Sequence, residues 1–248
     1  MRYFAELSYQ GTHYFGWQKQ PGQISVQATL EQAFSTILRT PVAMTGCGRT
    51  DTGVHARQYF AHFDSDNVLL PALERRLNQY LPRDIAIHRI IPVHPEAHAR
   101  FDAFQRSYEY HLSFRKIPFE QETCYWYGHT ALPDRDRVQA AAALLMNYRE
   151  FFPFCKSEAS AKTMHCDLTR AEWVFDDDAG RWVLHLTANR FLRGMVRLIV
   201  GMCLNVGLGK SSLDEVRYAL DTQTLLKKSQ SAPPQGLFLT EVLYPYSL

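Results

Sequence analysis

The chain is organised around one glycine-rich stretch, Gly46-Cys47-Gly48-Arg49-Thr50-Asp51-Thr52-Gly53-Val54-His55-Ala56. Glycine tolerates positive φ angles and lets a ligand come close to the main chain. Residues 42–45 before this stretch and 57–63 after it have the pattern of strands, so a sheet is expected to hold Asp51 still. Two interpretations remain open at this point. The stretch is either a surface hairpin whose Arg49 and Asp51 are only solvated, or a loop that binds or reacts.

Composition indicates an ordinary globular protein. The 248 residues are 46% hydrophobic and 21% charged, with a net charge of +2. No apolar run has membrane-spanning length, and the N-terminus lacks the apolar core of a signal peptide, so a cytoplasmic location without membrane association is expected. Five cysteines without a C-x-x-C pair favour reduced thiols over a disulfide framework or a zinc site. Any nucleic-acid surface must concentrate the small positive charge on one face.

The first half of the chain follows the order β-α-β-β-α-β. Alternating apolar residues predict a strand over 3–9, and Ser25 is a plausible N-cap for a helix ending near Thr40-Pro41. The two strands around the glycine-rich stretch come next. They precede an amphipathic helix with Leu73, Leu77 and Tyr80 on one face and a strand over 85–91. This order is that of the split βαβ unit, an antiparallel sheet with helices on one face.

The second half has a similar rhythm. A strand-like segment ends near residue 112, and Asp134 is expected to cap a helix. Strands are expected around 168–175 and 182–188, a helix with basic first turns over 189–201, and a helix with a Ser212–Glu215 capping box. A final strand covers 237–244. We therefore expect an α+β fold of two split-βαβ, ferredoxin- or RRM-like halves, 1–110 and 111–248, sharing a mostly antiparallel central sheet flanked by helices.

Three basic stretches, 46–57, 98–111 and 189–197, could bring arginines onto one face. Arginine suits phosphate binding and base stacking, although the same cations could belong to a solvated surface. Metal chemistry has little support, because no H-E-x-x-H or paired-cysteine pattern occurs. A phosphate-binding loop and a G-x-S-x-G elbow are also missing. The remaining reactive candidate is the carboxylate of Asp51.

Several motifs together resemble those of the tRNA pseudouridine synthase A family. They are Gly46-x-Gly48-Arg49-Thr50-Asp51-x-Gly53-Val54-His55-Ala56, Gly11 with Tyr14-x-Gly16-Trp17-Gln18, His98-Ala99-Arg100-Phe101, Arg106-x-Tyr108-x-Tyr110, Phe191 with Met195-Val196-Arg197-x-Ile199-Val200-Gly201, and Gly236-Leu237-Phe238-Leu239. The resemblance covers essentially the whole chain. Thr52, where alanine is frequent, and Arg193-Gly194 depart from the commonest pattern. The resemblance implies a pseudouridine-synthase fold and isomerisation of uridine to pseudouridine in the anticodon stem-loop of tRNA, at tRNA positions 38 to 40.

The resemblance also implies roles for individual residues. Asp51 would be the essential carboxylate, as a nucleophile or as a base. Arg197 would pair with Asp51 and keep it ionised. Tyr108 would stack on the target base and assist deprotonation at uracil C5, so that Asp51, Tyr108 and Arg197 are the expected catalytic residues. Arg49 would fill the space of the flipped nucleotide, because a stacked base is inaccessible. The apolar floor would be Leu237 or Leu239, and the other expected RNA contacts are His55, Arg100, Arg106 and Arg193.

The resemblance implies no metal or organic cofactor, and it implies a homodimer with tRNA as the partner. Two other classes compete with this interpretation. A non-catalytic RNA-binding domain would have no need for a carboxylate that faces phosphates. A metal-dependent hydrolase using His55 and Asp51 lacks further ligands in the sequence.

Overall fold

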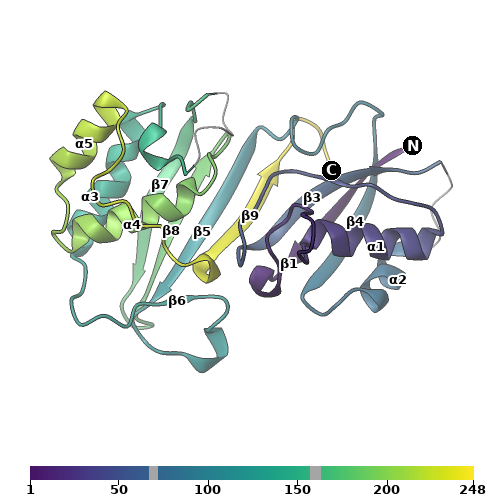
Figure 1. Cartoon of the computed structure of the whole chain (residues 1–248), viewed down its shortest axis with the longest axis horizontal. Coiled ribbons are helices and arrows are strands. Elements are labelled where there is room, and N and C mark those ends of the chain that lie inside the picture. The colour runs from purple at the N-terminus through teal and green to yellow at the C-terminus, as the bar shows by residue number, and fades with distance from the viewer. Residues whose placement is uncertain (67–71, 157–162) are drawn as a thin grey trace. The chain divides into compact units, whose positions relative to one another are not determined.

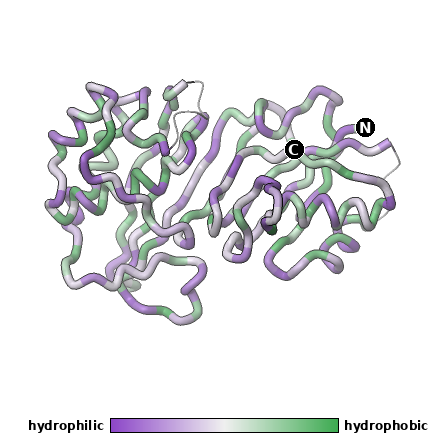
Figure 2. The backbone as a smooth tube through the Cα atoms, viewed as in Figure 1, coloured by the Kyte–Doolittle hydropathy of each residue, from purple (hydrophilic) through white to green (hydrophobic). Residues whose placement is uncertain are grey.

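The computed structural model describes residues 1–66, 72–156 and 163–248. The chain divides into two compact units, which are described separately. Unit 1 contains residues 1–106 and 238–248, and unit 2 contains residues 107–237. Hydrophobic and hydrophilic residues are interspersed along the trace of each unit (Figure 2). Within the described ranges, no helix combines the length and apolar character needed to cross a bilayer.

In the part of unit 1 that the structure describes, α1 and α2 pack with a sheet (Figure 1). Its elements are β1 (Arg2–Tyr9), a 3-10 turn (Gly11–His13), α1 (Val26–Leu38), β2 (Thr45–Gly46), β3 (His55–Asp64), α2 (Leu73–Tyr80), β4 (Ile85–Val93) and β9 (Leu237–Leu243). The strand order is β4-β1-β3, and both β2 and β9 pair with β3. The β1–β3, β1–β4 and β2–β3 pairs are antiparallel, whereas β9 lies parallel to β3. The predicted order β-α-β-β-α-β is confirmed, with the arrangement of a split βαβ unit.

Aromatic side chains fill both faces of the unit 1 sheet. On one face, Phe34 of α1 meets Phe63 of β3 edge to face, with ring centroids 4.9 Å apart. The Ser25 hydroxyl caps this helix by accepting from the Ala28 N–H at 3.3 Å. On the other face, Tyr244 packs its ring 5.2 Å from Phe4. The residues that follow β9 therefore cover the face of the sheet opposite α1.

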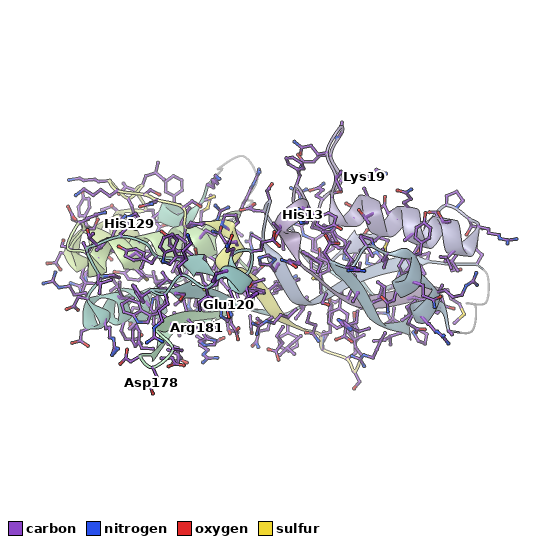
Figure 3. All side chains as sticks on the ribbon, turned by 90° about the horizontal axis from the view of Figure 1, so that it is seen from below. His13, Lys19, Glu120, His129, Asp178 and Arg181 are labelled. Carbon is purple, nitrogen blue, oxygen red and sulfur yellow. The ribbon has the colours of Figure 1, made fainter. Side chains whose placement is uncertain are left out.

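Unit 2 combines a sheet with three helices (Figure 1). Its strands and α-helices are β5 (Gln105–Ser113), β6 (Tyr125–Trp126), α3 (Arg135–Leu144), β7 (Leu168–Asp176), β8 (Arg181–Ala188), α4 (Met195–Gly207) and α5 (Leu213–Thr222). The first two residues of β5 belong to unit 1. Short 3-10 turns lie at Pro118–Glu120, Leu145–Asn147, Phe152–Phe154 and Pro234–Gly236. The order is β5-β8-β7, and β6 lies parallel to β5. Figure 3 shows Arg181 of β8 beside Glu120, with which it forms an ion pair. The predicted α+β class is confirmed.

The expected helix caps of unit 2 are present. The Asp134 carboxylate accepts from the Arg137 N–H at 2.9 Å, before α3. Ser212 and Glu215 form the reciprocal capping box of α5. Such caps satisfy the N–H groups that a helix leaves open in its first turn. Local sequence therefore defines where these two helices begin.

Two sequence-based expectations differ from the structure. Helix α4 begins at Met195 and not near Asn189, because Gly194 adopts a left-handed conformation with φ 71° at the N-cap. Arg190 and Arg193 consequently precede the helix. The expected division placed the final strand in the C-terminal half, whereas residues 238–248 belong to unit 1. The reason is a parallel pairing in which Phe238 lies opposite His55.

Candidate active site

The glycine-rich stretch of unit 1 forms the turn between β2 and β3, and we call residues 47–54 the Asp51 loop. Asp51 is half-buried, and the neighbouring Arg49 and Thr52 are exposed. The Val54 N–H donates to the Asp51 carbonyl at 3.2 Å and closes the turn. Strand β3 begins immediately afterwards, at His55. The carboxylate is therefore presented at the end of a sheet strand, as expected from the sequence.

Aromatic side chains fix the backbone of the Asp51 loop from within the unit. The Tyr59 hydroxyl donates to the Gly48 carbonyl at 2.5 Å, and its ring stacks on Trp17 with centroids 4.1 Å apart. The Tyr9 hydroxyl shares a hydrogen bond of 2.8 Å with the Thr50 hydroxyl. These two contacts lie on either side of Arg49 in the sequence. Because both tyrosines are buried, they restrict the loop from which Asp51 projects.

The segment after β1 covers the Asp51 loop through its main chain. The Trp17 N–H donates to the Thr50 carbonyl at 3.2 Å. A Cβ atom added at Gly11 would lie 1.9 Å from the Val54 carbonyl oxygen, and one added at Gly16 would lie 2.3 Å from that of Thr50. Only glycine permits such close approach. This accounts physically for two glycines of the N-terminal motif.

His55 is buried beneath the loop, with 1% of its surface exposed. Its Nδ1 accepts a hydrogen bond of 2.9 Å from the Gly11 N–H, and its ring stacks on Phe238 at 4.6 Å. An acceptor Nδ1 places the proton of the neutral ring on Nε2. In this structure His55 joins three segments of unit 1, and its expected RNA contact stays a prediction.

Arg106 is expected to contact RNA, and in the structure its guanidinium binds backbone carbonyls of unit 1. It donates to the carbonyls of Cys47 at 2.9 Å, Arg100 at 2.7 Å and Ala103 at 2.9 Å. Arg106 thus connects the start of the Asp51 loop with the turn that carries Arg100. The Arg100 side chain itself is exposed.

Burial raises the pKa of the Cys47 thiol to about 11, although Arg106 acts in the opposite direction. The thiolate is the nucleophilic form of cysteine. At neutral pH Cys47 is therefore protonated and is a poor candidate nucleophile, and Asp51 stays the candidate reactive group of the loop. Within the described part of the chain, no cluster of three or more His, Cys, Asp or Glu side chains is placed to hold a metal ion.

Unit 2 carries Arg197 on helix α4. Twelve of the 13 residues of α4 are buried, and Arg197 is the exception. Its Nε donates to the Ala232 carbonyl at 2.6 Å, and the Ala232 N–H returns a bond of 3.0 Å to the Arg197 carbonyl. Charged residues are rare in helices that are buried on all sides. Arg197 is the half-buried residue of the helix, and its expected role in the site stays a prediction.

The remaining candidates are divided between the units. In unit 2, Tyr108 is half-buried, and its ring meets Phe191 edge to face at 5.0 Å. Leu237, the last residue of unit 2, is 5% exposed, and Leu239 of unit 1 is 2% exposed. Arg193 is exposed before α4.

Sequence reasoning missed the supporting residues Tyr9, Tyr59 and Trp17. Tyr9 alternates with polar residues in β1, and Tyr59 lies in an apolar part of β3, so both were indistinguishable from ordinary core residues. Only the structure shows that their hydroxyl groups reach the Asp51 loop. The concentration of aromatic residues at positions 14–17 was the sequence feature that could have indicated a supporting role for Trp17.

Comparison with known proteins assigns most of the chain to one family model. The model described as tRNA pseudouridine synthase matches residues 5–102 and 142–245. A tRNA pseudouridine synthase A of Porphyromonas gingivalis is 45% identical over 250 aligned residues, which cover 100% of this chain and 98% of the relative. Proteins of the same name from Bacteroides fragilis and a Geobacillus strain are 43% and 35% identical, with at least 96% of both chains covered.

Proposed function

Because the chain belongs to the tRNA pseudouridine synthase family, a family of isomerases, we propose that it converts uridine to pseudouridine in the anticodon stem-loop of tRNA. The observation that supports this most is the Asp51 loop. Its Asp51 side chain is half-buried, and the preceding residues Gly48 and Thr50 are held by hydrogen bonds from Tyr59 and Tyr9. A fixed carboxylate next to solvent is suited to act on a substrate that enters from outside. The target positions are the neighbouring uridines 38 to 40.

The reaction exchanges one bond to the ribose for another. The bond between ribose C1′ and uracil N1 breaks, the base turns, and C1′ joins uracil C5. The proton of C5 leaves and N1 gains a proton, so nothing is oxidised or reduced. Asp51 acts either as a nucleophile at the ribose or as a base on a ribose proton. Both routes need a nucleotide that is flipped out of the stack.

The other residues bind the substrate and balance its charge. Arg197 supplies a cation that keeps the reacting carboxylate ionised when the substrate excludes water. Tyr108 lies against the target base, and Leu237 or Leu239 forms the apolar floor beneath it. Arg49 takes the place of the flipped nucleotide, and Arg193 binds phosphate. The protein acts in the cytoplasm as a homodimer and needs no metal ion.

Nucleoside chromatography tests this proposal directly. An unmodified tRNA transcript is incubated with the wild-type protein and a chelator, digested to nucleosides, and analysed for pseudouridine. We expect pseudouridine at one or more of positions 38 to 40, located by sequencing after chemical modification. A transcript that is bound but unchanged would contradict the enzymatic proposal and favour an RNA-binding module. Activity that disappears with chelator would contradict the metal-free mechanism.

A further inference from the structure

A turn in unit 1 exposes an aromatic ring next to a cation. Phe101 is 74% exposed, and Arg100 before it is exposed as well. The Arg100 guanidinium carbon lies 5.6 Å from the centre of the Phe101 ring. Single exposed apolar side chains are common on protein surfaces, so the exposure of Phe101 matters here only together with the neighbouring cation and the fixed backbone. We call residues 98–101 the Phe101 turn.

The backbone of the Phe101 turn is fixed although its side chains are exposed. The His98 Nδ1 accepts from the N–H groups of Arg100 at 3.1 Å and Phe101 at 3.2 Å. The Asp102 carboxylate accepts from the His98 N–H at 2.7 Å, and the Ala99 N–H donates to His62 Nδ1 at 3.1 Å. The turn therefore fixes the backbone from which the Phe101 ring projects, which lowers the ordering cost for a ligand.

The C-terminal residues of unit 1 also bind the Phe101 turn through hydrogen bonds. The Tyr244 hydroxyl donates to the Ala99 carbonyl at 2.6 Å, and the Tyr246 hydroxyl donates to Asp102 at 2.9 Å. The ring of His98 lies 4.2 Å from that of Phe101 and supports it from one side. The rest of the Phe101 ring, which is mostly exposed, stays open to solvent.

Arg106 links the Phe101 turn to the Asp51 loop. One terminal nitrogen of its guanidinium donates both to the Arg100 carbonyl at 2.7 Å and to the Cys47 carbonyl at 2.9 Å. Both contacts lie within unit 1. The exposed ring is therefore held at a fixed place relative to the loop of the proposed catalytic carboxylate.

The chemistry of the turn fits a nucleobase better than an apolar protein partner. A flat ring with a neighbouring guanidinium can stack a base and bind its phosphate, and stacking on aromatic residues does not depend on the base identity. Among the described residues, Arg100 forms no ion pair with a carboxylate. Its contact with the Phe101 ring is an exposed cation–π interaction, which is weak enough for a base to displace.

We propose that Phe101, with Arg100 beside it, is a stacking platform for an unpaired base of the RNA substrate, next to the nucleotide that reacts. This inference rests on the proposed function, because it takes tRNA as the ligand. It assigns Phe101 to substrate binding and not to the chemical step. A second copy of the chain is the other occupant that could cover such a ring.

The test measures affinity for an unmodified tRNA transcript together with kcat and KM for pseudouridine formation. We expect Phe101→Ala to weaken binding and raise KM by about tenfold, with kcat nearly unchanged. Phe101→Trp should restore both values, and its added fluorescence should be quenched when RNA binds. The matched control is Phe119→Ala in unit 2, because Phe119 is 98% exposed and lies on a different unit.

The salt dependence of tRNA affinity and the mass of the protein in solution distinguish a base-stacking platform from a contact between two copies of the chain. Phe101→Ala should leave the slope of log affinity against log salt unchanged, whereas Arg100→Ala should make it shallower by about one. Wild-type affinity and KM in Phe101→Ala would overturn the platform, as would equal losses in Phe119→Ala. A Phe101→Ala protein whose sedimentation shows a lower mass would overturn it in favour of a contact between copies. Because affinity is measured without turnover, a wild-type protein that makes no pseudouridine would contradict the proposed function and not the platform.

Discussion

The Asp51 loop and helix α4 carry the candidate charged groups Asp51 and Arg197, and the two backbones are held by opposite means. In the loop, the backbone is held by hydrogen bonds from Tyr59 and Tyr9 and by the segment that carries Trp17. In α4, twelve of the 13 residues are buried, and their packing fixes the helix. Arg197 is the one residue of α4 that is not buried. The loop depends on individual polar contacts, whereas the helix depends on its apolar surroundings.

This difference predicts how each region responds to substitution. Loss of one hydroxyl in the loop should change the position of the carboxylate while the core remains intact. Loss of the charge in α4 should remove function while the helix remains packed. Stability and activity should therefore separate in both regions, for different physical reasons.

Arg197→Met should have the largest effect on the helix side. We expect activity to fall by at least about a hundredfold, because the variant loses the cation that is proposed to keep the reacting carboxylate ionised. The free energy of unfolding should fall by no more than about 2 kcal/mol, since one hydrogen bond to the Ala232 carbonyl disappears while an apolar side chain suits α4. Activity assays and thermal unfolding check both values. An active Arg197→Met protein would contradict the functional role of this charge.

Tyr59→Phe should have an intermediate effect on the loop side. The ring still stacks on Trp17, but the hydroxyl that binds the Gly48 carbonyl is lost. We expect kcat to fall by about tenfold and the free energy of unfolding to fall by about 1 kcal/mol. Tyr3→Phe is the matched control, because its hydroxyl reaches only the Met1 sulfur at 3.7 Å. Equal kcat values for the two variants would show that the Tyr59 hydroxyl does not position the loop.

The pH dependence of stability should involve His62, which the Phe101 turn covers. Burial is the largest cause that lowers the pKa of His62 to about 4; His98 and Arg2 also lower it, and Asp64 and Asp102 act in the opposite direction. In the unfolded chain the pKa is about 6.5. The unfolded state therefore binds more protons in this interval, and the free energy of unfolding falls as the pH drops from about 6.5 toward about 4. His62→Gln should flatten this trend in thermal unfolding between pH 7 and pH 5; a trend identical to that of the wild type would assign it to other groups.

Arg193→Ala should have the smallest effect, because Arg193 is exposed and precedes α4. We expect tRNA affinity to fall a few-fold and the salt slope to become shallower by about one. Filter binding over a range of salt concentrations measures both. A slope equal to that of the wild type would exclude a phosphate contact at Arg193.

Local sequence signals predicted the parts of the fold that local physics determines. Apolar alternation identified β1 and β3, and Ser25, Asp134 and Ser212 marked helix starts through their capping side chains. The start of α4 was misplaced, because the left-handed conformation of Gly194 cannot be read from periodicity. The pairing of β9 with β3 was also hidden, because it joins residues that are far apart in the sequence.

The candidate site was predictable to a similar extent. The composition of the loop and the family resemblance identified Asp51. They did not identify Tyr59 or Tyr9, because a core tyrosine has the same sequence pattern whether or not its hydroxyl binds a loop. The resemblance implied an RNA contact for Arg106, which stays a prediction, and the sequence did not show that its guanidinium binds three carbonyls of unit 1.

The central claim is that the carboxylate of Asp51 performs the chemistry on a bound tRNA. The most direct measurement compares the wild type with Asp51→Asn in single-turnover release of tritium from tRNA labelled at uridine C5, with tRNA affinity measured in parallel. The account predicts that Asp51→Asn releases tritium at least about a thousandfold more slowly and binds tRNA with nearly wild-type affinity. Tritium release by Asp51→Asn at the wild-type rate would contradict the account.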